Sequence, residues 1–163
     1  MNPYASYLGN RDPIETLAGT PEKLNELVNR LGAQGAQGSL SPGKWSVREI
    51  LCHLADTEIA HGFRLRQALS ENHHVIQPFD QDRWAENYAG FDARAALDVF
   101  TALRKWNAAL IAAMPSESLS KPLTHPERGE MTVRTLVETM AGHDLNHLQQ
   151  IETIAGRTHA AQA

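Results

Sequence analysis

The feature that most constrains the fold of this chain is a series of helix starts, each followed by apolar residues three or four positions apart. The clearest start is at Ser46, whose hydroxyl can cap a helix while Glu49 reaches back to the Ser46 backbone as the second half of a capping box. An apolar stripe follows at helical spacing: Val47, Ile50, Leu51, Leu54, His61, Leu65 and Leu69. The pattern predicts a long amphipathic helix over residues 46–69.

Three further long helices are predicted from the same signals. Asp12 and Pro13 begin a short helical turn that Gly19 ends, and Thr20 then starts a helix that Gly32 ends. The other two run from Asp92 to Pro115 and from Thr132 to Gly156. Strand signals are absent, and a short helix is expected at 82–88. The chain is thus predicted to be all-α, a four-helix bundle forming a single domain over 1–163 with its core at about 12–155.

The connector between the second and third long helices is long enough to affect the topology. It covers about 22 residues (70–91), whereas the preceding helix is about 35 Å long at 1.5 Å per residue. The connector can therefore return along the whole helix, which allows the two helices to be parallel. An up-down-down-up bundle is therefore feasible.

Composition excludes several classes of function. The formal charge is −4 and the basic residues are scattered, which disfavours a nucleic-acid partner. No segment is apolar enough to suggest a membrane span or a signal peptide, so a cytoplasmic protein without a membrane partner is expected. Cys52 is the only cysteine, which excludes an internal disulfide and a cysteine-rich zinc site.

Two of the eight histidines form a candidate metal-binding pair. His143 and His147 are four residues apart, so their side chains lie on the same helix face and two imidazoles can reach one ion. Two hydrogen-bonded core histidines would give the same pattern. A zinc-peptidase motif is excluded, because Asp144 stands where that motif has glutamate and Thr153 stands where its longer form has a third histidine.

A third ligand has to come from another helix. The helix at 46–69 offers His53 and His61, and helical periodicity places His61 nearer the apolar face. Antiparallel packing would bring His53 to the level of His143 and His147, and His61 would lie about 12 Å further along the axis. The residues alone therefore leave both candidates open.

At this point the chain resembles a known family. The segments Trp45–Asp56, Asp82–Ala85, Phe100–Arg104 and His143–Ile151 are similar, in this order, to sequence blocks of the DinB/YfiT-like superfamily of metalloproteins. The resemblance implies an up-down-down-up four-helix bundle that holds a divalent metal, with zinc or nickel expected, through His53, His143 and His147. It also implies a metal-dependent hydrolase or a small-thiol S-transferase, a low-molecular-weight thiol as a possible cofactor, and a homodimer. The alternative is a metal-binding stress-response or interaction module without turnover.

Polar residues at apolar positions supply the remaining candidates. Asp144 and Glu58 are candidate general bases or hydrogen-bond acceptors for a ligand imidazole, although a buried ion pair with Arg104 is the favoured explanation of both. Arg104, Asn107 and Trp84 are the candidates for contact with a small-molecule substrate. His125 is a remote candidate near the cavity.

Overall fold

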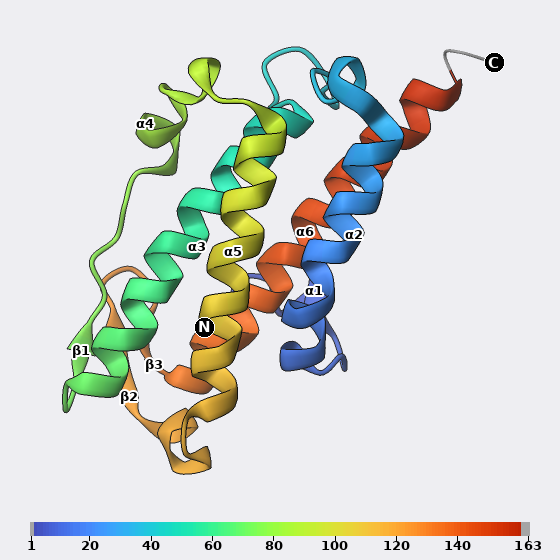
Figure 1. Ribbon diagram of the computed structural model, residues 1–163. Helices are drawn as coiled ribbons and strands as arrows, with labels where there is room; N and C mark the ends of the chain where they lie inside the picture. Colours follow the sequence, from blue (N-terminus) through green and yellow to red (C-terminus); the bar gives the residue numbers. More distant parts are fainter. Residues whose placement is uncertain (1, 161–163) are drawn as a thin grey trace.

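The computed structural model describes residues 2–160 and has four long helices with a small sheet at one end (Figure 1). One short helical turn precedes the first long helix, and the other short turns and the strands lie in the connections between the long helices. In chain order the elements are α1 (Ala5–Leu8), α2 (Pro13–Gly35), α3 (Val47–Ser70), β1 (His74–Val75), α4 (Gln81–Ala85), η1 (Tyr88–Gly90), α5 (Ala93–Ala113), η2 (Ser116–Ser120), β2 (Pro122–His125), β3 (Gly129–Thr132) and α6 (Val133–Ala160).

The four long helices confirm the predicted bundle. In Figure 1, α2 and α6 run towards one end of the molecule, and α3 and α5 run towards the other, which is the up-down-down-up order. The most extensive contacts are between α3 and α5 and between α2 and α6. No helix in the part of the chain that the structure describes is long and apolar enough to cross a membrane.

The predicted helix starts are present as hydrogen bonds. Ser46 and Glu49 form the complete capping box of α3, with the Ser46 N–H donating to Glu49 Oε2 at 2.7 Å. Asp92 accepts from the first backbone N–H groups of α5, and the Thr135 N–H donates to Thr132 Oγ1 at the start of α6. These caps are local in sequence, which is why the sequence alone locates them.

The prediction that Gly19 ends a short turn is wrong, because α2 continues through Gly19 and Pro21 to a break at Gly32 (φ 65°). Pro21 has no N–H to donate to the carbonyl of Leu17 one turn earlier. The Arg104 guanidinium of α5 donates to that carbonyl instead, at 3.2 Å. A side chain from another helix thus replaces the missing backbone hydrogen bond.

The predicted end of the last helix at Gly156 is also wrong, since α6 runs to Ala160. Glycine ends helices most effectively when it adopts a left-handed conformation, and Gly156 is not among the described glycines with positive φ. The helix therefore passes through this position.

A three-stranded sheet, which was not predicted from the sequence, joins the long connector to the segment before α6. The order is β1-β2-β3, with β1 parallel to β2 and β2 antiparallel to β3. Strands of two and four residues are too short for an alternating pattern to stand out. The β2–β3 turn at residues 125–129 lies beside the bundle histidines, because His125 and Arg128 line the same cavity as His53 and His143.

The core is divided into two apolar clusters with a buried polar layer between them. Leu51, Phe100 and Ile151 belong to one cluster, and Leu65 and Met140 belong to the other. On α3, α5 and α6, buried polar side chains lie between the two clusters or, for His53, at the edge of the first: His53, Thr57, Glu58, His61, Arg104, Asn107, His143, Asp144 and His147. Nearly all the candidate site residues lie in this layer.

Candidate metal centre

Three imidazoles converge within the polar layer. His53 comes from α3, and His143 and His147 come from successive turns of α6. The Nε2 atom of His143 is 3.0 Å from Nε2 of His53 and 3.1 Å from Nε2 of His147. The three side chains are buried, and one nitrogen from each lies within 4.8 Å of the others. The structure therefore brings together the three residues that the family resemblance implied.

The spacing of these nitrogens fits a shared metal ion. Bonds of about 2.0–2.1 Å at tetrahedral angles place two ligand nitrogens roughly 3.3 Å apart. The two short nitrogen–nitrogen distances, 3.0 and 3.1 Å, are close to this value. Three neutral imidazoles supply three of the four positions around a zinc-type ion, so one position stays open to a water or a substrate.

Burial keeps these imidazoles neutral, which is the state that binds a metal. It lowers the pKa of His53 to about 3 and that of His147 to about 4, and it places the pKa of His143 well below the ordinary value. The neighbouring imidazoles lower the pKa values of His53 and His143 further. At neutral pH each ring therefore has a lone pair available for a cation.

Hydrogen bonding fixes the proton on the far side of one of these rings. His147 Nδ1 lies 3.0 Å from Gln150 Oε1, which can only accept, so Nδ1 carries the proton and Nε2 turns its lone pair towards the cluster. His53 Nδ1 is buried without a hydrogen-bond partner in the described part of the chain, and its ring packs on Trp45 with the centroids 4.8 Å apart.

The candidate bases Glu58 and Asp144 are both bound to Arg104. Arg104 donates through Nε and Nη2 to Glu58 at 3.0 and 2.8 Å, and through Nη1 and Nη2 to Asp144. All three side chains are at most 3% exposed. The ion pairs considered from the sequence are thus present, and no hydrogen bond links either carboxylate to the three imidazoles among the described residues.

The substrate-contact candidates do not line the space at the three histidines. Asn107 is buried and donates to the Glu58 carboxylate at 3.0 Å, within the same polar network as Arg104. Trp84 on α4 stacks on Phe79 with a centroid distance of 4.5 Å and is partly exposed. Of these residues only Trp84 approaches the site, through Phe79, which does line a cavity there.

Two cavities meet at the histidine cluster, and both include His53 and Tyr4 in their walls. The first, of about 280 Å³, extends from His53 and His143 past His61. The second, of about 370 Å³, lies beside His147. Asn146 and Gln150 line the second cavity.

Several residues in these walls were not predicted from the sequence. Tyr4 precedes the bundle, and its ring meets that of His143 edge-on at 5.2 Å. Arg64 and Arg128 line the first cavity, and Trp45 and Lys44 line the second. The helical spacing of Arg64 from His53 and His61 could have predicted that Arg64 lies on the same face of α3 as these histidines. Tyr4 and Arg128 are brought to the cavities only by the tertiary fold.

The two alternative histidines lie in the first cavity rather than in the cluster. The ring of His61 is 6.2 Å from that of His143, and His125 stands at the end of β2. The backbone N–H of Glu127 donates to His125 Nδ1 at 3.2 Å, so Nε2 carries the proton of the neutral ring. Both residues are buried polar groups beside the three-histidine cluster.

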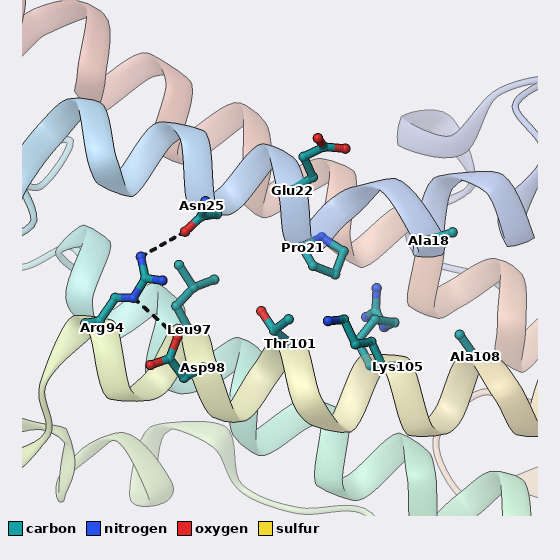
Figure 2. A pocket seen from close by; sticks show the side chains of 11 residues that line it. Ala18, Pro21, Glu22, Asn25, Arg94, Leu97, Asp98, Thr101, Lys105 and Ala108 are labelled. Carbon is teal, nitrogen blue, oxygen red and sulfur yellow. Dashed lines mark hydrogen bonds and ion pairs between the residues drawn. The ribbon is translucent and has the colours of Figure 1, made fainter.

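A cavity larger than the two at the histidine cluster lies elsewhere. It is a groove of about 670 Å³. Figure 2 shows that it lies between α2 and α5, with Arg94, Leu97, Thr101 and Lys105 along the α5 side. Arg104 contributes to this groove, but none of the three clustered histidines does. Volume alone therefore does not identify the site.

Comparison with known proteins agrees with this arrangement. Residues 16–151 match the profile of the DinB superfamily. A protein of Oceanobacillus iheyensis named "Putative metal-dependent hydrolase" is 28% identical over 145 residues, which cover 88% of this chain and 84% of that protein. A Bacillus cereus protein of the same name is 26% identical over 148 residues, with the same shares of the two chains. YfiT from Bacillus subtilis, a "probable metal-dependent hydrolase with an unusual four-helix bundle topology", shares the fold with a TM-score of 0.83 and 23% identity, over 90% of this chain and 85% of its own.

Proposed function

The chain belongs to the DinB superfamily, and we propose that it is a metal-dependent hydrolase of a small molecule. The observation that carries the proposal is the convergence of three neutral imidazoles from α3 and α6 at a point where two cavities meet. A purely structural histidine cluster has no need of adjoining polar space. The names of the similar proteins support hydrolysis as the reaction class.

In this proposal His53, His143 and His147 hold one divalent ion, zinc or nickel, through their Nε2 atoms. When bound, such an ion supplies Lewis acidity, because it polarises the oxygen of a carbonyl or of a water molecule. Hydrolysis adds the elements of water across an acyl bond and releases a carboxylic acid and an amine or alcohol. Zinc and nickel both suit imidazole ligands, so the residues do not distinguish between them.

The protein's own residues orient the site and handle protons. Gln150 holds His147 in the tautomer whose Nε2 faces the cluster. His125 presents a protonated Nε2 that can donate a hydrogen bond to a substrate oxygen. The Arg104 network joins α3, α5 and α6, and through Leu17 also α2, so Glu58 and Asp144 act as positioning residues for the helices that bear the histidines.

A small-thiol S-transferase would use the same metal site, with the ion activating a thiol instead of water. The similar proteins are named hydrolases, which favours hydrolysis, and the two reactions are separated by the assay below. The non-catalytic binding module is the remaining alternative. The homodimer, the single domain and the absence of a nucleic-acid partner stay predictions.

The test is a panel of small amides and esters, run with and without a low-molecular-weight thiol, on untagged protein before and after treatment with a chelator. We expect hydrolysis without thiol that is lost with the metal and in His147→Ala. His73→Ala is the matched control, because that exposed ring binds Thr124 away from the cluster, and it should retain full activity. Turnover only with a thiol, or none that depends on the metal, would contradict the proposal.

A further inference from the structure

The first cavity at the histidine cluster has a charged wall that the proposed reaction does not use. Arg64 on α3 and Arg128 in the β2–β3 turn both line it, and Glu127 is the acidic residue in its walls. The chain as a whole carries a formal charge of −4. A net positive wall inside an acidic protein is an arrangement that attracts anions.

The position of Arg64 connects this wall to the metal site. His53, Thr57, His61 and Arg64 follow one another along the same face of α3, and all four line the cavity. Side chains on a helix lean towards its N-terminus, which directs the Arg64 guanidinium back along α3 towards His61, whose pKa its charge lowers after the larger effect of burial. Arg64 is half-buried, donates to the Gln77 carbonyl at 3.1 Å and lies over the Phe79 ring at 5.3 Å, so its position is fixed.

Arg128 reaches the same space from a different element. It lies in the hairpin turn that follows His125, and its backbone N–H donates to the His125 carbonyl at 3.1 Å. The charges of Arg64 and Arg128 lower the pKa values of His61 and His125, after the larger effect of burial. The fields of the two guanidinium groups therefore overlap inside the cavity, and the Glu127 carboxylate opposes them only in part.

We propose that this cavity binds an anionic group of the substrate, a carboxylate or a phosphate, and so selects small anionic acyl compounds for the three-histidine site. The selection of a substrate rests on the proposed function, whereas the binding of an anion in this cavity does not. Guanidinium groups match carboxylate and phosphate oxygens in charge and geometry. His125 Nε2–H adds a neutral donor, and a volume of about 280 Å³ limits the occupant to a small molecule. The bond to be hydrolysed then lies at His53 and His143, where the two cavities meet.

Three compounds that differ only in one terminal group test the proposal. Hippurate carries a carboxylate, N-benzoylaminomethylphosphonate carries a phosphonate, and hippuramide is neutral. Binding of each is measured by isothermal titration calorimetry to the wild type, Arg64→Gln and Arg128→Gln. Arg94→Gln is the matched control. This substitution removes the same charge as the two cavity variants, but Arg94 lies in the groove between α2 and α5 (Figure 2).

We expect at least one anion to bind about tenfold more tightly than hippuramide, and each cavity variant to lose about tenfold in anion affinity. Tighter binding of hippurate identifies a carboxylate substrate, and tighter binding of the phosphonate identifies a phosphate. Arg128 is exposed at a turn, so Arg128→Gln keeps the test valid if Arg64→Gln fails to fold. Equal binding of the three compounds, no binding of any of them, or losses no greater than in Arg94→Gln would overturn the proposal.

The same titrations after metal removal separate this inference from the proposed function. Neither arginine is a metal ligand, so the preference for an anion should persist in the metal-free protein. Anion selectivity without any metal-dependent hydrolysis would leave the binding site in place and refute the hydrolase. Metal-dependent hydrolysis with no dependence on Arg64 and Arg128 would support the hydrolase and refute the anion-binding site.

Discussion

Replacing Arg104 by methionine is predicted to destabilise the protein strongly. Arg104 is 2% exposed and donates to two carboxylates and one backbone carbonyl. Methionine fills much of the same volume but supplies no donor. The substitution leaves Glu58 and Asp144 buried without a cation, and the Leu17 carbonyl without the donor that replaces the missing N–H of Pro21.

The expected magnitude follows from the burial of this network. Removing one partner of a buried ion pair typically costs about 3–5 kcal/mol, because the remaining charge keeps its desolvation penalty. For a domain of this size, 1 kcal/mol shifts Tm by about 2–4 °C, so Arg104→Met should lower Tm by roughly 6–20 °C. This is a large share of the 5–15 kcal/mol that usually stabilises a domain.

The loss of stability in Arg104→Met should also depend on pH. Burial raises the pKa of the Asp144 carboxyl, and Arg104 opposes that rise. Without Arg104 the pKa rises further, so the folded variant binds a proton that the unfolded chain releases. Stability of the variant then falls as pH rises from the unfolded pKa of the carboxyl through its folded pKa. The deficit relative to the wild type should therefore be smaller at pH 5 than at pH 7.

Urea denaturation followed by circular dichroism measures both effects. Arg94→Met on the same helix is the control, since Arg94 is half-exposed and its ion pair with Asp98 should contribute less than about 1 kcal/mol. Adding Glu58→Gln and Asp144→Asn to Arg104→Met should recover part of the loss, because no charge is then left buried. A loss below about 1 kcal/mol, or one that does not change with pH, would refute the reasoning.

Three further predictions follow from the site. Gln150→Leu removes the acceptor that fixes His147 and should weaken metal binding by about 10- to 100-fold in a chelator competition, while a smaller change than threefold would contradict the role of Gln150. Gly142→Ala should destabilise the protein by about 1–3 kcal/mol in denaturant titrations, because a Cβ there would lie 2.5 Å from the Tyr4 carbonyl oxygen; Gly156→Ala, with open space around it, should be neutral or stabilising. The metal-free protein should lose stability as pH falls below about 6.5, since imidazoles with folded pKa values of about 3 and about 4 bind protons only when unfolded. Each contributes about 1.4 kcal/mol per pH unit between its two pKa values, and a thermal denaturation midpoint that stays constant from pH 7 to pH 5 would contradict this assignment.

Local signals in the sequence predict most of the bundle, whereas long-range contacts account for the errors. The starts at Ser46 and Asp92 depend on residues three or fewer positions away, and these were predicted correctly. The continuation of α2 through Pro21 depends on Arg104, which is more than 80 residues away in the chain. No pattern within α2 could have revealed that donor.

In the candidate site, too, local spacing predicts some residues and long-range packing places the others. The four-residue spacing of His143 and His147 marks a shared face from the sequence alone. The choice between His53 and His61 depended on the family resemblance, because both rings lie on one face of α3 and only the packing of α6 decides which meets the pair. Arg128 could not be predicted, because its place in the cavity wall depends on the pairing of β2 with β3, and these strands are too short to show a periodic pattern in the sequence.

The most direct test of the account is the metal content of the untagged protein and its single histidine variants, measured by elemental analysis after dialysis. The account predicts one divalent ion per chain in the wild type and in His61→Ala, and less than about a tenth of that in His53→Ala, His143→Ala and His147→Ala. A full ion retained by His53→Ala, or an ion lost only from His61→Ala, would contradict the three-histidine site.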